Sequence, residues 1–345
     1  MIREMGDIFR AKGEIIFYAE HRDYYPYLEG LIGELGNVCY ITSDPGDPIL
    51  STPGALYLNR LLPLFMALAG CKVFVMTMPD LDLFHIRRSI RGVHYVYVFH
   101  SPVSTHMVYR FGAFDHYDSI LCVGPHQLKE IRRHEELYGT KRKKLVETGY
   151  CRLEKLYEAY RKYDRKDREI TVLVAPTWES TNLLEICGEE LLEMLSGEGY
   201  RVILRLHPET VKKRRYSPQD GVILETSVAN MDSLVEADIL ITDWSGIGLE
   251  YAFGTERPVV FIDTPPKVRN PKYRELDIEP IESYLRDKIG VVVSPGELGR
   301  IPSVIQGLMA DRELYRSTIP RLRSGYIFNF GRSSGVGADY IGGLL

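Results

Sequence analysis

Several residues with side chains suited to phosphate chemistry follow predicted strands. His100 ends an aromatic strand predicted at 95–99 and precedes Ser101 in the following loop. An imidazole at such a position titrates near neutrality and could take the proton from an attacking hydroxyl group. A structural role is more common for any one of the nine histidines. The strand-end position favours catalysis for His100, whereas His106 stays ambiguous.

A second group of polar residues follows two strands in the other half of the chain. Arg205 and His207 end the strand predicted at 201–206, and Pro208 fixes the turn. A guanidinium and an imidazole side by side can donate charge-assisted hydrogen bonds to a diphosphate. Thr177 follows the strand predicted at 170–175 and presents a hydroxyl group, for which a plain helix cap is the alternative.

The strongest local pattern is an apolar strand that runs into Asp243 and is followed by a helix beginning at Ser245 and Gly246. Free amides at a helix N-terminus attract anions. Gly246 would let a phosphate approach the backbone, and Ser245 could donate a hydroxyl hydrogen bond. Glu250 either accepts from ribose hydroxyls or is a solvated helix residue. The spacing matches neither a dinucleotide GxGxxG nor a GxxxxGK[ST] loop, so NAD and ATPase functions lose support.

The composition is that of a soluble globular protein. The 345 residues are 45% hydrophobic and 26% charged, and this length favours two domains. The 43 Lys and Arg against 47 Asp and Glu give a net charge of −4, which offers no global field for nucleic acid. Five cysteines without metal-like spacing predict reduced, buried thiols in a cytoplasmic protein. The charged residues 1–12 lack the apolar core of a signal peptide.

Strand-like and helical runs alternate along the chain, which predicts an α/β protein with parallel sheets. A polar, charged stretch at 157–169 separates two such series. We therefore predict two doubly wound, Rossmann-like domains that face each other across a cleft, at residues 1–160 and 161–325. A C-terminal helix in 326–345 is expected to pack back on the first domain. Ligands collect at the carboxyl ends of parallel strands, where the candidate residues lie.

Taken together, the motifs resemble those of the CDP-glycerol glycerophosphotransferase family, the primases and polymerases of teichoic-acid assembly. The matching segments are 99–102, 148–152, 172–178, 202–208, 240–245, 250–252 and 257–261. The resemblance implies a GT-B fold. It also implies an enzyme that transfers glycerol phosphate, or a related alditol phosphate, from CDP-glycerol to a hydroxyl group of a membrane-linked glycolipid or polymer, with release of CMP.

The resemblance also implies roles for individual residues. His100 matches the family's general base, and His207 matches the histidine that binds and activates the phosphates. The positions expected around the nucleotide and pyrophosphate are Thr177, Asp243, Ser245 and Gly246. Arg205 and Glu250 are added from their local chemistry. Gly246 stands where the family usually has a serine.

No cofactor is required by these motifs, although Mg²⁺ positioned through waters by Asp243 or Asp263 stays open. The apolar stretch 56–69 and basic runs at 132–133, 141–144 and 212–215 predict docking on anionic lipids at the inner face of the cell membrane. Two other functions stay open. One is a GT-B glycosyltransferase that uses a nucleotide sugar, and the other is a non-catalytic nucleotide-binding protein.

Overall fold

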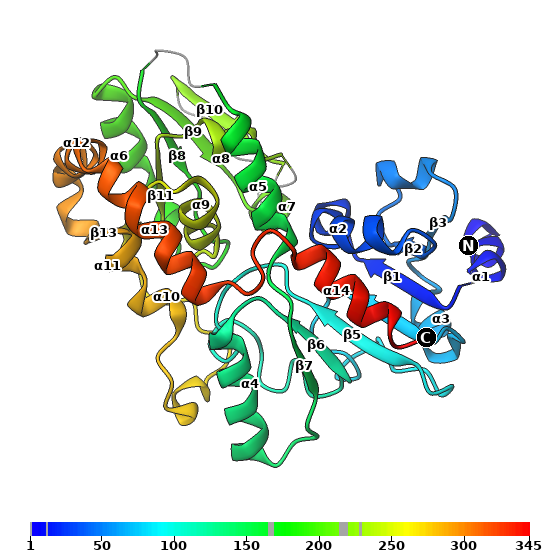
Figure 1. Ribbon diagram of the computed structural model, residues 1–345. Coiled ribbons are helices and arrows are strands. Elements are labelled where there is room, and N and C mark those ends of the chain that lie inside the picture. Colours follow the sequence, from blue (N-terminus) through cyan, green and yellow to red (C-terminus); the bar gives the residue numbers. More distant parts are fainter. Residues whose placement is uncertain (1, 12, 165–168, 214–219, 228–229) are drawn as a thin grey trace.

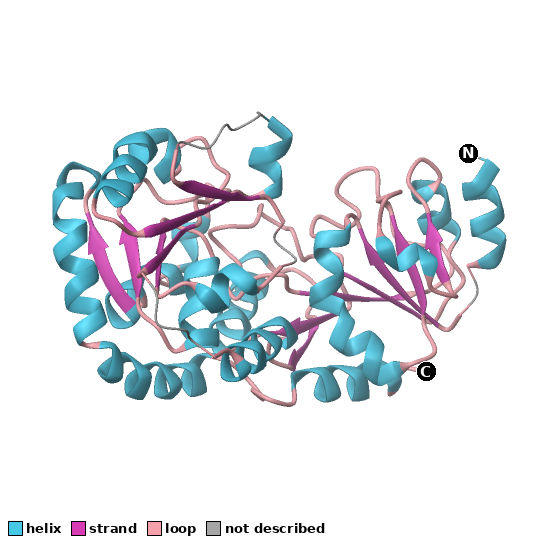
Figure 2. Cartoon of the chain, turned by 90° about the horizontal axis from the view of Figure 1, so that it is seen from above, coloured by secondary structure: helices cyan, strands magenta, loops and turns pink. Residues whose placement is uncertain are grey.

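The computed structural model describes residues 2–11, 13–164, 169–213, 220–227 and 230–345. Within them the chain builds two separate parallel sheets, each with helices on its faces (Figures 1 and 2). The strand order is β3-β2-β1-β4-β5-β6-β7 in the first sheet and β10-β9-β8-β11-β12-β13 in the second. The predicted α/β class with two doubly wound sheets is confirmed.

The first sheet is built from short apolar strands. Most are buried along their whole length, as expected where helices cover both faces of a parallel sheet. Their bounds are β1 Ile15–Ala19, β2 Cys39–Thr42, β3 Ala55–Tyr57, β4 Val73–Met76, β5 His94–Val98, β6 Ser119–Cys122 and β7 Lys144–Glu147. The helices of this part are α1 Ile2–Arg10, α2 Tyr25–Leu35, α3 Leu62–Leu68, α4 Pro125–Tyr138 and α5 Cys151–Lys162.

The second sheet repeats the same alternation. Its strands are β8 Thr171–Val174, β9 Arg201–Arg205, β10 Val222–Glu225, β11 Ile239–Thr242, β12 Val259–Ile262 and β13 Gly290–Val293. The helices that follow α5 in the chain are α6 Leu183–Gly197, α7 Pro208–Lys213, α8 Asp232–Glu236, α9 Ile247–Thr255, α10 Ile281–Tyr284, α11 Arg286–Ile289, α12 Ile301–Ala310, α13 Arg312–Tyr326 and α14 Ser333–Gly342.

Two segments join the parts of the chain that carry the sheets. Helix α5 leaves the first sheet and packs against both α2 and α9. After α13, the chain returns and α14 lies along α2, next to the first sheet (Figure 1). The C-terminal helix therefore covers a helix of the first sheet. Residues 165–168 of the polar stretch 157–169, where the domain boundary was expected, lie outside the described residues.

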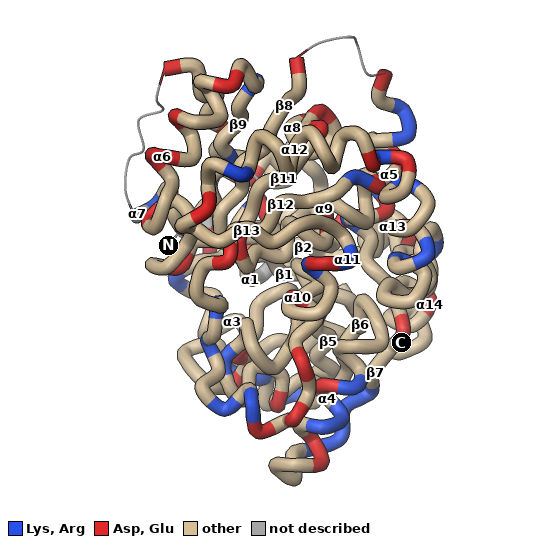
Figure 3. Tube along the Cα trace, turned by 90° about the vertical axis from the view of Figure 1, so that its left-hand side faces the viewer, with Lys and Arg blue, Asp and Glu red and all other residues tan. Residues whose placement is uncertain are grey.

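The surface features expected to touch a membrane differ from the sequence prediction. Residues 56–69 are not one apolar helix, because 55–57 form β3 and only Leu62–Leu68 form α3. Within the basic run at 141–144, Lys143 is buried, 3.6 Å from Glu135 and 3.5 Å from Asp115. In the run at 212–215, residues 214 and 215 lie outside the described residues. Acidic and basic positions are interspersed along the trace (Figure 3).

All five cysteines are buried and unpaired, as predicted. Among the described residues, no helix combines the length and the apolar character needed to cross a bilayer.

Candidate active site

His100 lies two residues beyond β5 among aromatic rings. Its ring centroid is 5.4 Å from that of Tyr24 and 6.0 Å from that of Tyr27. Burial, together with the positive charge of Lys267, lowers the pKa of His100 to about 4. Its Nδ1 atom is buried and has no hydrogen-bond partner among the described residues. The imidazole is therefore neutral at pH 7 and holds an unused lone pair, as a general base requires.

The loop after His100 lies against the N-terminus of α9. A Cβ atom added at Gly246 would stand 2.1 Å from Ser101 Oγ and 2.7 Å from Val103 Cγ1. Gly246 is the N-cap of α9, and no side chain caps the helix there. The positive end of the α9 dipole thus faces the loop that carries His100. The candidates from the first and second sheets are therefore neighbours in space.

Asp243, directly after β11, is almost fully buried and binds backbone amides. Its Oδ1 accepts from the Thr177 N–H at 2.9 Å, and its Oδ2 accepts from the Leu183 N–H at 3.0 Å. Burial raises the pKa of this carboxyl group. The two oxygens hold the loop after β8 and the first turn of α6. Asp243 therefore acts by positioning Thr177.

His207 follows β9 and is half-buried. Its Nδ1 accepts a hydrogen bond from the Glu209 N–H at 3.1 Å, so the neutral ring carries its proton on Nε2 and can donate there. The centroid of its ring lies 6.1 Å from that of Trp178. His207 therefore brings the loop after β9 into contact with the loop after β8. Both loops lie at the carboxyl ends of parallel strands, where ligands bind in such sheets.

Arg205 is 3% exposed and lies at the end of β9. Its Nη1 donates to Ser233 Oγ at 3.0 Å and is 3.5 Å from Glu225 Oε2. Burial lowers the pKa of this guanidinium, and Glu225 and Glu250 oppose that effect. The arginine thus remains beside the other candidates, although one of its nitrogens is already held by β10 and α8.

Glu250 is not a solvated helix residue, because only 5% of it is exposed. Tyr150 donates its hydroxyl to Glu250 Oε1 at 2.7 Å, and Arg152 Nε lies 3.6 Å from Oε2. Arg152 in turn lies over the ring of Tyr27, 5.0 Å from its centroid. The carboxylate therefore connects α9 to the start of α5, and the role expected at ribose hydroxyls competes with these partners.

Two basic residues near the site were missing from the candidates. Lys267 Nζ and Arg269 Cζ lie 5.3 and 5.1 Å from the ring centroid of Trp178. Burial lowers the pKa of Lys267, and Asp243 is among the carboxylates that oppose the shift. Both residues lie in the loop after β12. The rule that ligands collect after parallel strands would have found them, but no motif marks this loop.

The described residues contain no group of three or more His, Cys, Asp or Glu side chains able to hold a metal ion. Asp263, one of the two carboxylates considered for Mg²⁺, lies 3.0 Å from Arg286 Nη1 through its Oδ1. Asp243 uses both oxygens for backbone amides.

One segment of the chain matches a known protein family. Residues 109–265 match the family model described as CDP-Glycerol:Poly(glycerophosphate) glycerophosphotransferase. This segment belongs to that family. The resemblance seen in the motifs is thereby confirmed, and the glycerophosphotransferase segment contains every candidate residue except His100. The match of this segment supports the function of a transferase that uses CDP-glycerol.

Solved structures confirm the GT-B fold of the chain. A solved chain of the wall teichoic acid polymerase TagF is 16% identical, with 99% of this chain and 92% of that solved chain covered and a TM-score of 0.62. A putative UDP-N-acetylglucosamine 2-epimerase from Listeria monocytogenes is 12% identical, with 93% of each chain covered and a TM-score of 0.57. The glycotransferase of kitacinnamycin is 15% identical, with 97% of this chain and 100% of that chain covered and a TM-score of 0.56. No curated protein matches the sequence.

Proposed function

We propose that the chain transfers glycerol phosphate, or a related alditol phosphate, from CDP-glycerol to a hydroxyl group of a lipid-linked saccharide or polymer. CMP is the second product. The family match over residues 109–265 supports the donor, and a TagF structure was soaked with CDPG. The observation that carries the proposal is the neutral imidazole of His100, whose Nδ1 has no hydrogen-bond partner among the described residues, next to the N-terminus of α9.

In this reaction the acceptor oxygen attacks the phosphorus that bears glycerol. The new oxygen–phosphorus bond forms as the bond from that phosphorus to the bridging oxygen breaks, and CMP leaves with the bridging oxygen. His100 takes the proton of the acceptor hydroxyl group. The electron pair of the broken bond leaves on CMP, whose charge needs donors in place before the reaction begins.

The second sheet supplies those donors. His207 can donate from Nε2 because its Nδ1 already accepts from Glu209. Lys267 and the amides at the start of α9 add positive charge on the same side, with Ser245 and Gly246 as the contact residues. Asp243 acts through Thr177, whose amide it holds. Arg205 on β9 and Glu250 on α9 lie near Arg152 and support the loops that carry these donors.

The decisive experiment measures CMP released from CDP-glycerol with a lipid-linked saccharide acceptor. The wild-type chain should turn over, and His100→Ala should lose about 10²- to 10⁴-fold in rate while still binding the donor. His85→Ala changes an exposed histidine and is the matched control. Normal turnover by His100→Ala would remove the assignment. Release of a nucleoside diphosphate from a nucleotide sugar would instead establish a glycosyltransferase, and donor binding without turnover a nucleotide-binding protein.

We further propose that the first sheet docks on an anionic membrane surface at the cytoplasmic face, which would bring the site to a lipid-linked acceptor. Leu64 and Leu68 of α3 are 56% and 45% exposed, and Ile90 is 82% exposed. Ile90 lies beside α3, because its N–H donates to Ala67 O at 3.1 Å. The neighbouring Arg91 is also exposed. An apolar patch next to a cation suits shallow insertion among anionic headgroups.

Sedimentation with vesicles tests this docking. The wild-type chain should sediment with vesicles containing phosphatidylglycerol at low salt and less so at high salt. Replacing Leu64 and Ile90 together by Glu should abolish sedimentation. The matched control is Leu314→Glu, an exposed leucine on α13 that is 61% exposed. Sedimentation of the double variant at the wild-type level would exclude this surface.

A further inference from the structure

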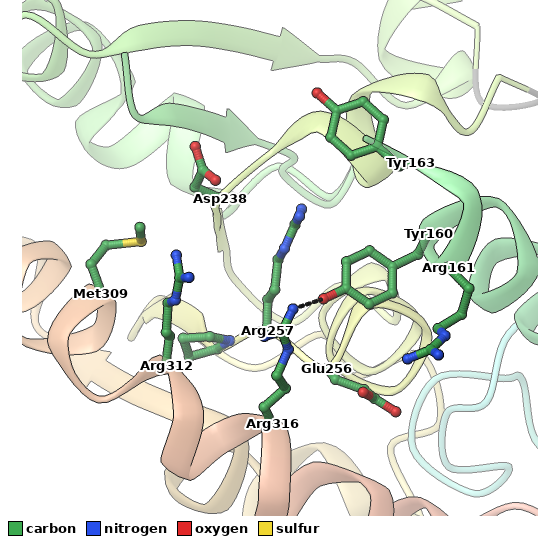
Figure 4. A pocket seen from close by; sticks show the side chains of 10 residues that line it. Tyr160, Arg161, Tyr163, Asp238, Glu256, Arg257, Met309, Arg312 and Arg316 are labelled. Carbon is green, nitrogen blue, oxygen red and sulfur yellow. Dashed lines mark hydrogen bonds between the residues drawn. The ribbon is translucent and has the colours of Figure 1, made fainter. Parts of the chain in front are cut away.

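A cavity of about 270 Å³ lies between the end of α5, the turn before β12 and the start of α13 (Figure 4). Four arginines line it, namely Arg161, Arg257, Arg312 and Arg316. Asp238, which also lines the cavity, directly precedes β11, whereas Asp243 directly follows that strand. Four strand residues span about 13 Å. The cavity is therefore at the opposite end of the sheet from the candidate active site.

The carboxylates lining this cavity are held by groups other than its four arginines. Glu256 Oε1 lies 3.1 Å from Arg323 Nη2, and Asp238 Oδ2 accepts from the Thr171 N–H at 2.9 Å. Outside the cavity, Glu313 Oε1 lies 3.0 Å from Arg316 Nη1 and 3.6 Å from Arg312 Nε, but the Glu313 side chain is 68% exposed. Water screens such a surface pair. Excess positive charge therefore remains at the cavity.

The central arginine is held in place before any ligand arrives. Arg257 Nη1 donates to the backbone oxygens of Val235, at 2.7 Å, and Ala237. The Arg257 guanidinium carbon lies 4.8 Å from the centroid of the Tyr160 ring. The hydroxyl of Tyr160 accepts a hydrogen bond from Arg316 Nη2 at 3.4 Å (Figure 4). A guanidinium has five N–H donors, so a fixed Arg257 still has donors for an anion.

We propose that this cavity binds a small ligand through a doubly charged phosphate group. The guanidinium fork matches phosphate oxygens in pairs, and arginines from separate elements can surround one anion. The cavity is at the small end of ligand sites, which suits inorganic phosphate, pyrophosphate or a phosphomonoester such as CMP. A bound phosphate would bridge the α9–β12 turn and α13, close to the end of α5.

Amide hydrogen exchange locates the binding. Saturating pyrophosphate should slow exchange at the end of α5 and in the first two turns of α13. Protection that appears only in the loop after β5 and at the start of α9 would overturn the proposal, because the anion would then occupy the candidate active site. Parallel runs with inorganic phosphate and with CMP identify the source of the phosphate group by which of them protects α5 and α13.

Calorimetric titration with pyrophosphate supplies the second test. Replacing Arg312 and Arg316 together by Ala should weaken this binding at least tenfold and abolish the protection of α13. Both residues are exposed, so the fold should survive. Arg321→Ala, an exposed change on the same helix outside the cavity, should bind as the wild type does. Unchanged binding by the double variant, or equal weakening by Arg321→Ala, would overturn the site. The site is independent of the proposed transfer reaction, because no readout uses turnover.

Discussion

Ser101 and Gly246 lie in contact across the two halves of the molecule, so closely that a methyl group on Gly246 would stand 2.1 Å from Ser101 Oγ. One residue follows the candidate base and the other begins the helix whose amides face it. The missing side chain at position 246 is therefore what allows the loop after β5 to sit on the N-terminus of α9.

This contact predicts the effect of Gly246→Ala. The new methyl group would also meet Val103 Cγ1 at 2.7 Å, and overpacking of this kind costs about 1–3 kcal/mol. Thermal and urea unfolding should show the loss, and transfer activity should fall with it because the two loops separate. Gly307→Ala, where nothing lies within 4 Å of the added atom, is the control. Wild-type stability and activity for Gly246→Ala would contradict the contact.

The pKa of His100 predicts an unusual acid limb in the pH profile. A histidine at its ordinary pKa of 6.5 would lose base function below pH 6.5, whereas His100 stays neutral down to about pH 4. The value of kcat/KM should therefore stay level from pH 7 to pH 5 as far as His100 is concerned. Steady-state kinetics and an NMR titration of the ring test this. A ring that titrates above pH 6 would refute the assigned environment.

The buried Tyr150–Glu250–Arg152 group predicts large losses on truncation. Glu250→Ala removes the carboxylate from beside Arg152, which is 3% exposed, and breaking such a buried pair costs about 3–5 kcal/mol. Tyr150→Phe removes one hydrogen bond and leaves a buried acceptor, at about 1–3 kcal/mol. Urea unfolding measures both changes. Glu313→Ala, at an exposed carboxylate, should change stability by less than about 0.5 kcal/mol; an equal loss there would contradict this ranking.

Glu282 predicts a loss of stability as the pH rises. Burial raises its pKa from 4.5 to about 7, and Glu130 contributes. Its Oε1 accepts from the N–H of Ser104 at 2.9 Å. The folded chain keeps this proton up to about pH 7, whereas the unfolded chain releases it near pH 4.5. The contribution of Glu282 to the free energy of unfolding therefore decreases as the pH rises from 4.5 to about 7. Burial opposes the charged form of nearby His106, but Glu130, the backbone of Ile278 and Glu282 together raise its pKa above the ordinary value. The titration of His106 therefore extends the decline in stability above pH 6.5.

Glu282→Gln keeps an acceptor for Ser104 but cannot titrate. Its free energy of unfolding should therefore change less between pH 5 and pH 7 than that of the wild type, by urea unfolding at each pH. Identical slopes in the two chains would show that Glu282 is ionised throughout.

Much of the fold was determined by the sequence alone. Fully apolar runs such as 120–123 are buried between covering layers. Their alternation with helical stretches indicates parallel sheets. The family motifs are also local, because each consists of a strand end and the turn after it. This is why His100, His207 and the stretch from Asp243 to Gly246 could be chosen as candidates from the sequence.

Only the tertiary structure decided which partners the charged residues have. Glu250 has the same local pattern whether it faces solvent or Tyr150, because the hydroxyl group comes from 100 residues away. Lys267 carries no motif and becomes part of the site only because the loop after β12 lies beside Trp178. Likewise Lys143, which the sequence predicts to be a surface charge, is buried and pairs with Glu135 and Asp115. Desolvation and ion pairing depend on distance in space, which local spacing along the chain does not specify.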